Sequence, residues 1–226
     1  YRKHGSSGSY SKIDTVYVPT TEYYDTDGSL VGGDIYYYKV SAVSVIGEGV
    51  QSVEQSIMFK DKPNAISDLT IIGHGDGYIS LDWSEPNTNG DSISVYRVYY
   101  STYDGGYSSY YTTSNTHFTH TDLTNGQIYW YYVTAINGMG ESGESNHVTD
   151  YPSTLPGGPT DLSSPTHTIN SISLSWNPPL DTGSSPILNY FVYRSEEKGV
   201  SYNQIASVEG VTNSYLDNSG LTAGKM

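Results

Sequence analysis

The sequence predicts an all-β protein made of tandem two-sheet sandwiches, and three observations carry this prediction. Residues that favour strands and turns dominate, with 24 Tyr and 24 Gly among 226 residues. Short segments alternate apolar and polar residues with a period of two, and turn sequences such as Asn89-Gly90 and Asn125-Gly126 separate them. Two blocks of sequence also recur about 93 residues apart.

The first recurring block ends in a tryptophan, and the second follows a glycine turn. Ile79–Trp83 (ISLDW) recurs as Ile172–Trp176 (ISLSW), and proline follows each copy. Gly33–Ala42 (GDIYYYKVSA) recurs, with substitutions, in the stretch that begins at Gly126. This period is too long for a solenoid unit and suits a sandwich domain. No stretch carries a sustained helical pattern.

These blocks resemble the fibronectin type III domain over essentially the whole chain. Trp83 and Trp176 resemble its core tryptophan, and Tyr36 and Tyr129 resemble the tyrosine corner that opens its sixth strand. The resemblance implies tandem seven-stranded, immunoglobulin-like β-sandwiches. It implies no single function, because this fold serves as spacer, adhesion module or binding scaffold in different proteins.

Aligning the chain with itself at the 93-residue offset, which we call the repeat frame, predicts one complete module between two partial ones. Residues 1–62 form the C-terminal part of a module, residues 63–156 a complete module, and residues 157–226 the N-terminal part of a third. Proline-containing connectors at Lys60–Pro63 and Pro152–Pro159 are expected to hold neighbouring modules at restricted angles.

The partial end modules have two explanations. We favour a window cut from a longer chain of similar modules, in which processing or the choice of fragment removed what preceded Tyr1. Leu221–Met226 aligns with Leu123–Ile128, one residue before the expected corner tyrosine. Alternatively, halves from neighbouring copies complete each other by strand exchange. Residues 1–35 and 193–226 are the same part of the module, so exchange would supply those strands twice.

Charge and composition narrow the classes of partner. The net charge is −14, which argues against nucleic acid or anionic lipid as a partner, because both need a basic surface. No apolar run approaches membrane-spanning length, so no membrane insertion is expected. The chain has no cysteine and therefore needs neither a disulfide nor a thiolate metal site.

No pattern predicts catalysis, a cofactor or a metal. The sequence has no Gly-x-Ser-x-Gly motif, no cysteine nucleophile and no phosphate-loop spacing. Asp25–Gly28 (DTDG) faintly resembles a calcium loop but lacks the closing glutamate, and a turn is the better interpretation. No pair of histidines has the spacing of a helical zinc motif, and surface imidazoles are expected at His4, His74, His117, His120, His147 and His167.

The best candidate site is an aromatic outer face of the middle module. On its sixth strand Tyr129, Tyr131, Val133 and Ala135 should face the core. The resemblance makes the third strand a neighbour of the sixth. The candidate interface on the outer side therefore consists of Arg97, Tyr99, Trp130 and Tyr132. The alternative is aromatic cross-strand pairing, worth roughly 0.2–1 kcal/mol per pair, that only stabilises the sheet.

The sequence therefore favours a non-catalytic structural and adhesive region of an extracellular filament, stalk or surface-layer protein. Such a region would associate with other copies or neighbouring modules, and a glycan or a cell-surface protein is a further candidate partner. The alternative is a spacer or carbohydrate-contacting accessory region of a secreted polysaccharide-degrading enzyme. Receptor-like binding of a protein ligand has less support, because no particular loop stands out.

Overall fold

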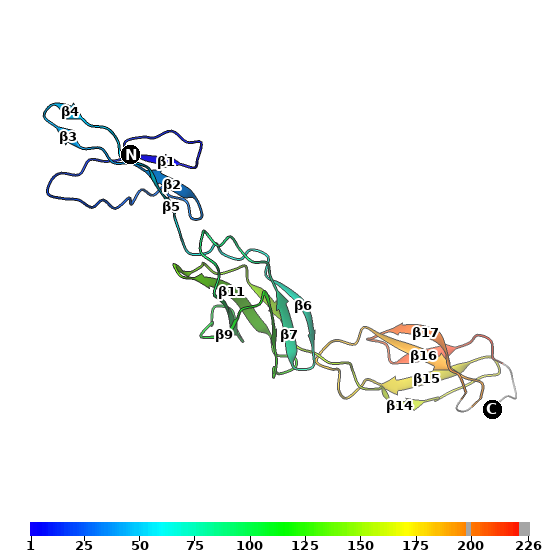
Figure 1. Ribbon diagram of the computed structural model, residues 1–226. Coiled ribbons are helices and arrows are strands. Elements are labelled where there is room, and N and C mark those ends of the chain that lie inside the picture. Colours follow the sequence, from blue (N-terminus) through cyan, green and yellow to red (C-terminus); the bar gives the residue numbers. More distant parts are fainter. Residues whose placement is uncertain (198–199, 222–226) are drawn as a thin grey trace. The chain divides into compact units, whose positions relative to one another are not determined.

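The computed structural model describes residues 1–197 and 200–221, and these contain eighteen strands and no helix (Figure 1). The predicted all-β class is confirmed. Contacts group the chain into two compact units. The first contains Tyr1–Ile72, Ser80–Thr119 and Tyr129–Asp150, and the second contains Gly73–Ile79, His120–Ile128 and the described part of Tyr151–Met226. This division passes through the middle repeat, and the module boundaries at 62/63 and 156/157 stay predictions.

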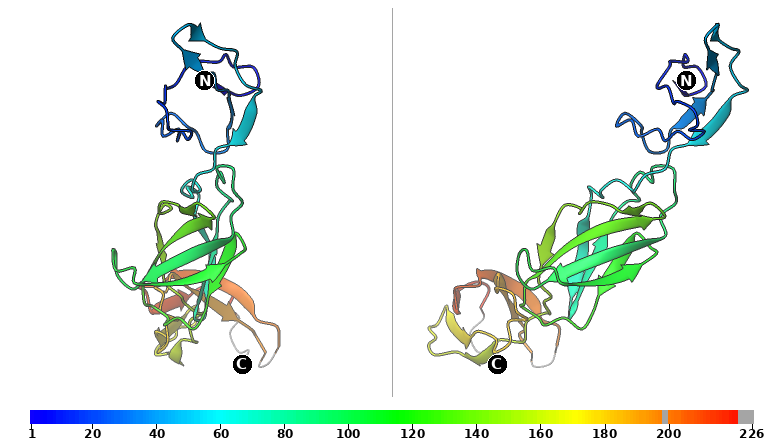
Figure 2. Two further views of the ribbon diagram at one scale, coloured as in Figure 1. Left: turned by 60° about the vertical axis from the view of Figure 1, so that its left-hand side comes forward. Right: turned by 90° about the vertical axis from the view of Figure 1, so that its left-hand side faces the viewer.

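The middle repeat contains two sheets, drawn in teal and green in Figure 2. The first has the order β10-β7-β6, with β6 at Thr70–Gly75, β7 at Tyr78–Asp82 and β10 at His117–His120. The second is antiparallel and has the order β12-β11-β8-β9, with β13 also paired to β11. Its strands are β8 (Val95–Ser101), β9 (Ser109–Thr113), β11 (Tyr129–Asn137), β12 (Gly140–Glu141) and β13 (Val148–Asp150).

The core of the middle repeat draws side chains from both sheets, because alternate residues of each strand point inward. The side chains that are 0% exposed include Ile79, Leu81, Val98, Tyr131, Val133 and Ala135. Trp83 meets Tyr96 edge-on, with ring centroids 5.6 Å apart. The predicted inward set on β11 is confirmed, since Tyr129 is also buried.

The first repeat contains a sheet in the order β1-β2-β5, with β1 at Arg2–His4, β2 at Ile35–Tyr38 and β5 at Gln55–Met58. A short hairpin, β3 (Val43–Ser44) and β4 (Gly47–Glu48), follows β2. The Tyr36 side chain is buried, and its hydroxyl accepts a hydrogen bond from the Val31 backbone N–H at 2.9 Å. This bond to upstream backbone is the one expected of a tyrosine corner.

The third repeat contains the sheet β14-β15-β18 and the pair β16-β17. Its strands are β14 (Thr160–Ser163), β15 (Ile172–Asn177), β16 (Asn189–Arg194), β17 (Asn203–Glu209) and β18 (Ser214–Asp217). Trp176 meets Tyr190 edge-on at 5.4 Å and 67°, which repeats the 67° pairing of Trp83 with Tyr96. The predicted alignment of Leu221–Met226 with Leu123–Ile128 concerns almost only residues 222–226, which lie outside the described residues.

Candidate interaction surface

The register of the middle repeat brings the predicted interface residues to one side of a sheet. On β8 and β11, Tyr99 lies opposite Tyr132, Arg97 opposite Thr134, and Ser101 opposite Trp130. Residues directly opposite on antiparallel strands share a face. Tyr110 on β9 joins this face, because it lies opposite Tyr99. We call the side of the sheet that carries these residues the outer face.

Five rings of the outer face and its flanking segments pack in a continuous series, which we call the ring stack. Tyr99 has its ring centroid 5.1 Å from that of Tyr110 and 4.6 Å from that of Tyr132, and it is nearly parallel to the Tyr132 ring. His147 lies 5.2 Å from Tyr132, also nearly parallel. Tyr107 meets Tyr132 edge-on at 4.7 Å, and its hydroxyl lies 3.2 Å from His147 Nδ1. Aromatic pairs in such geometries stabilise by about 0.5–1.5 kcal/mol beyond their buried area.

Tyr132 points outward as predicted, but it is not exposed. Tyr99 and His147 are stacked against its ring and Tyr107 meets it edge-on, leaving the side chain only 8% exposed. This burial raises the pKa of Tyr132 to about 12. Tyr132 therefore supports the outer face from beneath. Tyr110 is 47% exposed, and Arg97, Tyr99 and Trp130 are partly exposed, so these remain available for contact.

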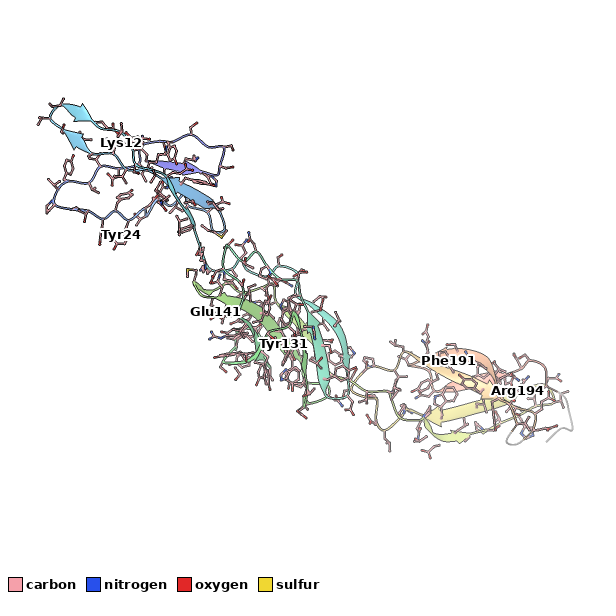
Figure 3. The ribbon with its side chains drawn as sticks, viewed as in Figure 1. Lys12, Tyr24, Tyr131, Glu141, Phe191 and Arg194 are labelled. Carbon is pink, nitrogen blue, oxygen red and sulfur yellow. The ribbon has the colours of Figure 1, made fainter. Side chains whose placement is uncertain are left out.

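A charged network lies at one end of the ring stack, around Glu141 of β12 (labelled in Figure 3). Glu141 Oε2 accepts a hydrogen bond from Arg97 Nη1 at 2.5 Å. Glu141 Oε1 accepts from Thr134 Oγ1 at 2.6 Å and from the Tyr99 hydroxyl at 3.1 Å. The Arg97 guanidinium lies 4.8 Å from the Tyr110 ring centroid, within cation–π range. The hydrogen bond with Tyr99, followed by the charge of Glu141, raises the pKa of Arg97.

The tyrosine and hydroxyl bonds of this network recur in the first repeat. There the Ser41 hydroxyl donates to Glu48 Oε1 at 2.5 Å, and the Tyr1 hydroxyl also donates to Glu48. In the repeat frame Tyr1, Ser41 and Glu48 are the counterparts of Tyr99, Thr134 and Glu141. Neither glutamate was predicted from the sequence as a site residue. The recurring Gly-Glu pairs at Gly47–Glu48 and Gly140–Glu141 carried the signal that could have found them.

The turn at Asp25–Gly28 holds an arginine side chain between its two carboxylates. Arg2 Nη1 lies 2.9 Å from Asp25, Arg2 Nη2 lies 2.8 Å from Asp27, and the Tyr38 hydroxyl donates to Asp25 at 2.9 Å. Burial alone would raise the pKa of Asp25, but the bonds from Tyr38, the Asp27 backbone and Arg2 hold it below its usual value. The turn interpretation fits, since Leu30 N–H donates to the Asp27 carbonyl. No metal-ligating group of three side chains occurs within 1–197 and 200–221.

One histidine prediction is wrong. His120 is 4% exposed, so it is not a surface imidazole, and burial lowers the pKa of its ring below 6.5. It stands last in β10 and points inward, whereas His117, three residues earlier, is exposed. The other five imidazoles are exposed. In the described part of the chain, no helix is long and apolar enough to cross a membrane.

Two sheets with a buried tryptophan, and a tyrosine corner in the first repeat, define an immunoglobulin-like β-sandwich. Residues 64–151 match the family model described as "Fibronectin type III domain". Residues 64–151 thus form a fibronectin type III domain, and the recurring sequence blocks extend the resemblance to this family into the repeats on both sides. Such modules are generally non-catalytic.

Relatives carry similar stretches in very different proteins. The chain is 29% identical over 217 residues to human myomesin-2, covering 87% of this chain and 14% of that protein. It is 30% identical over 214 residues to exoglucanase B of Cellulomonas fimi, covering 88% of this chain and 18% of that protein. It is 35% identical over 124 residues to amylopullulanase of Thermoanaerobacter thermohydrosulfuricus, covering 51% and 8%. The chain thus spans less than a fifth of the length of these relatives.

Solved structures contain similar tandem domains. The chicken CNTN1 FN1–FN3 domains align with a TM-score of 0.47 and 21% identity, covering 82% of this chain and 66% of that chain.

Proposed function

We propose that this chain is a non-catalytic structural and adhesive region of an extracellular filament, stalk or surface-layer protein. In this proposal the modules set spacing, and their outer faces bind other copies or neighbouring modules. The carrying observation is the outer face of the middle module, where partly exposed Arg97, Tyr99, Tyr110 and Trp130 lie on a support of packed rings. Aromatic and arginine side chains held rigid lose little conformational entropy on binding, which suits an interface.

The experiment tests the accessible residues and spares the buried support. We expect Tyr110→Ser combined with Trp130→Thr to weaken concentration-dependent self-association at least tenfold in analytical ultracentrifugation. Tyr24→Ser is the matched control, because Tyr24 is 78% exposed in the first repeat and lies outside the outer face. Equal self-association of the double variant and the control would refute the proposal.

A second candidate function is an accessory region of a secreted polysaccharide-degrading enzyme. The observation that favours it is the similarity to stretches of exoglucanase B and amylopullulanase. In that role the outer face would contact a glucan, with Tyr110 and Trp130 as stacking surfaces. Sedimentation of the chain with insoluble cellulose or starch distinguishes the two. Binding lost in the Tyr110→Ser, Trp130→Thr variant would support this role, and no binding to either polymer would exclude it.

A further inference from the structure

Tyr99 and Tyr110 are two phenols that face each other across the strands β8 and β9 of the middle repeat. They occupy directly opposite positions in the register, and their ring centroids lie 5.1 Å apart. Tyr110 is 47% exposed and Tyr99 is partly exposed, so a dissolved oxidant can reach this pair. Two phenols held this close can be joined covalently when each of them loses one electron.

The angle between the two rings distinguishes this pair from two other close tyrosine pairs of the middle repeat. A carbon–carbon bond between two aromatic rings lies near the plane of each ring, so the rings must meet at their edges. The Tyr99 and Tyr110 rings are tilted by 50°, which turns an edge of one ring toward the other. The Tyr99 and Tyr132 rings are stacked at 16°, and the Tyr100 and Tyr111 rings at 20°, so these pairs meet at their faces. The geometry therefore favours a bond between Tyr99 and Tyr110.

One carboxylate orients both rings and is placed to accept a proton from one of them. Glu141 Oε1 accepts a hydrogen bond from the Tyr99 hydroxyl at 3.1 Å, and Glu141 Oε2 accepts one from Arg97 at 2.5 Å. The Arg97 guanidinium in turn lies 4.8 Å from the Tyr110 ring centroid. A phenol that loses an electron becomes a strong acid and releases its proton. Glu141 can take the proton of Tyr99, and the exposed Tyr110 can release its own to water.

A second phenol of the ring stack has the same kind of partner. The Tyr107 hydroxyl lies 3.2 Å from His147 Nδ1, and His147 Nε2 lies 3.1 Å from a carboxylate oxygen of Glu144. With Nδ1 as the acceptor, the imidazole can take the proton of an oxidised Tyr107. Tyr132 lies between the two phenols, 4.7 Å from Tyr107 and 4.6 Å from Tyr99. The ring stack thus forms a continuous path along which an electron can pass from Tyr99 to an oxidised Tyr107.

We propose that Tyr99 and Tyr110 are an oxidative cross-linking site, at which a haem peroxidase with hydrogen peroxide joins the two rings as dityrosine. Each phenol gives up one electron and one proton, and hydrogen peroxide takes up two of each to become two molecules of water. The unpaired electron of each phenoxyl radical resides partly on the ring carbons next to the oxygen-bearing carbon. A bond forms between one such carbon of each ring. Each bonded carbon then releases its hydrogen as a proton, each phenoxyl oxygen takes up one proton, and the protein has lost two hydrogen atoms in total.

The bond would tie an edge strand to its sheet. The strand β9 is the last in the order β12-β11-β8-β9, and within the described residues it pairs with β8 alone. An edge strand can separate from its neighbour locally, without unfolding of the whole domain. A covalent bond between directly opposite residues would prevent this separation. The site requires one copy of the chain only, and it therefore goes beyond the self-association proposed above.

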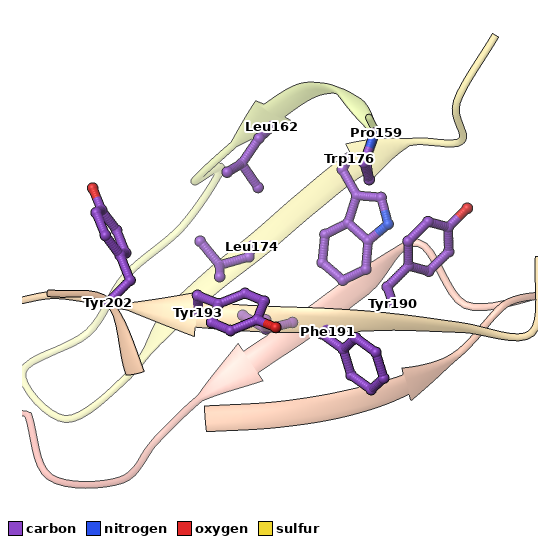
Figure 4. A pocket seen from close by; sticks show the side chains of 9 residues that line it. Pro159, Leu162, Leu174, Trp176, Tyr190, Phe191, Tyr193 and Tyr202 are labelled. Carbon is purple, nitrogen blue, oxygen red and sulfur yellow. The ribbon is translucent and has the colours of Figure 1, made fainter. Parts of the chain in front are cut away.

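The third repeat shows that the position of Tyr99 is not sufficient to make such a site. Tyr193 of β16, labelled in Figure 4, is the counterpart of Tyr99, and it is 53% exposed. The residue opposite it on β17 is Gln204, which occupies the position of Tyr110. An oxidant can reach Tyr193, but the residue opposite has no phenol to join. The facing pair of phenols at this position distinguishes the middle repeat from the third.

The test is a brief oxidation of the whole 226-residue chain by haem peroxidase and hydrogen peroxide, at a protein concentration that keeps the chain monomeric. Cleavage on the N-terminal side of aspartate separates the two tyrosines, because Asp104 lies between them. Tyr99 is then on the peptide 91–103 and Tyr110 on the peptide 104–121. We expect mass spectrometry to find these peptides joined, with a mass equal to their sum less two hydrogen atoms. Tyr99→Phe and Tyr110→Phe should each lower the yield of the joined peptide at least tenfold.

Matched variants separate this site from general oxidation of tyrosines. Tyr103→Phe removes a phenol that is 66% exposed and shares a peptide with Tyr99. Tyr111→Phe removes the exposed phenol next to Tyr110. Both variants should leave the yield of the joined peptide within twofold of the wild-type value. Glu141→Gln should slow the joining at least threefold, because an amide is a poor proton acceptor.

The inference is overturned if the joined peptide persists in Tyr99→Phe or Tyr110→Phe, or if Tyr103→Phe lowers its yield as much. Covalent dimers in place of a joined monomer would also overturn it, as would addition of oxygen to the partly exposed Trp130 without joining. An unchanged rate in Glu141→Gln would overturn the assigned role of the carboxylate. Native hydrogen exchange of β8 and β11 in each variant excludes misfolding as the cause of a lost bond.

Discussion

Tyr132 tests whether a ring of the outer face stabilises the sheet or is available for binding. Its side chain is 8% exposed, and a buried aromatic side chain removes about 150–250 Å² from water, worth about 4–6 kcal/mol at 25 cal/mol/Å². When Tyr132 is replaced by alanine, neighbouring rings and water can fill part of the space that its ring leaves on the outer face. We therefore expect Tyr132→Ala to lower the free energy of unfolding of the middle module by about 3 kcal/mol. Tyr110→Ala should cost about 1 kcal/mol, because that ring is 47% exposed.

The measurement must report on the middle module alone, since the chain contains several modules. Urea titration followed by hydrogen–deuterium exchange of β8 and β11 peptides does so. Tyr193→Ala is the matched control, because Tyr193 occupies the position of Tyr99 in the third repeat and should leave those peptides unchanged. If Tyr132→Ala costs no more than Tyr110→Ala, the ring stack is not a support, and the assignment of Tyr132 as a buried residue is refuted.

Three further predictions concern buried titratable groups. The pKa of Tyr132 is raised from 10.0 to about 12, so its contribution to stability is present below pH 10 and lost between about pH 10 and 12. Tyr132→Phe should therefore reduce the loss of stability that urea titrations measure across this range. The pKa of His120 is lowered below 6.5, so its contribution to the free energy of unfolding is present above that pH. This contribution falls on acidification by at most about 1.4 kcal/mol per pH unit. His120→Gln should make the free energy of unfolding depend less on pH in this range. Asp217 is 2% exposed, and Asp217→Ala should destabilise the third repeat by about 3 kcal/mol, because it removes the buried carboxylate that Arg194 binds. Asp217→Leu with Arg194→Leu should recover part of the loss, and hydrogen exchange of β15 and β18 measures both.

Alternation and repetition predicted the parts of the molecule that local rules determine. Tyr131, Val133 and Ala135 are buried because a strand places alternate residues on one side, and a period of two is visible in the sequence. The family resemblance implied that β8 and β11 are adjacent strands. Their register brings Tyr99 opposite Tyr132.

The exposure of Tyr132 and His120 could not be predicted in this way. Tyr132 is covered by Tyr107, from the segment between β8 and β9, and by His147, from the segment before β13. A strand pattern contains no information about how a connecting segment folds over a sheet. His120 is buried by its place at the end of β10, whereas a histidine in a polar sequence context is ordinarily a surface residue.

The repeated tyrosine–hydroxyl–glutamate network indicates what the outer faces do for each module. In both repeats the glutamate lies in a short hairpin strand, β4 after β2 and β12 after β11, and it accepts a hydrogen bond from a tyrosine of the neighbouring β1 or β8 segment. The bond from Ser41 or Thr134 fixes the same carboxylate to its own strand. A turn tied at both points opens less readily than a free hairpin, since opening must break several charge-assisted hydrogen bonds together. Both repeats thus fix the hairpin that follows the strand of the tyrosine corner, and the network should therefore contribute to the stability of each module.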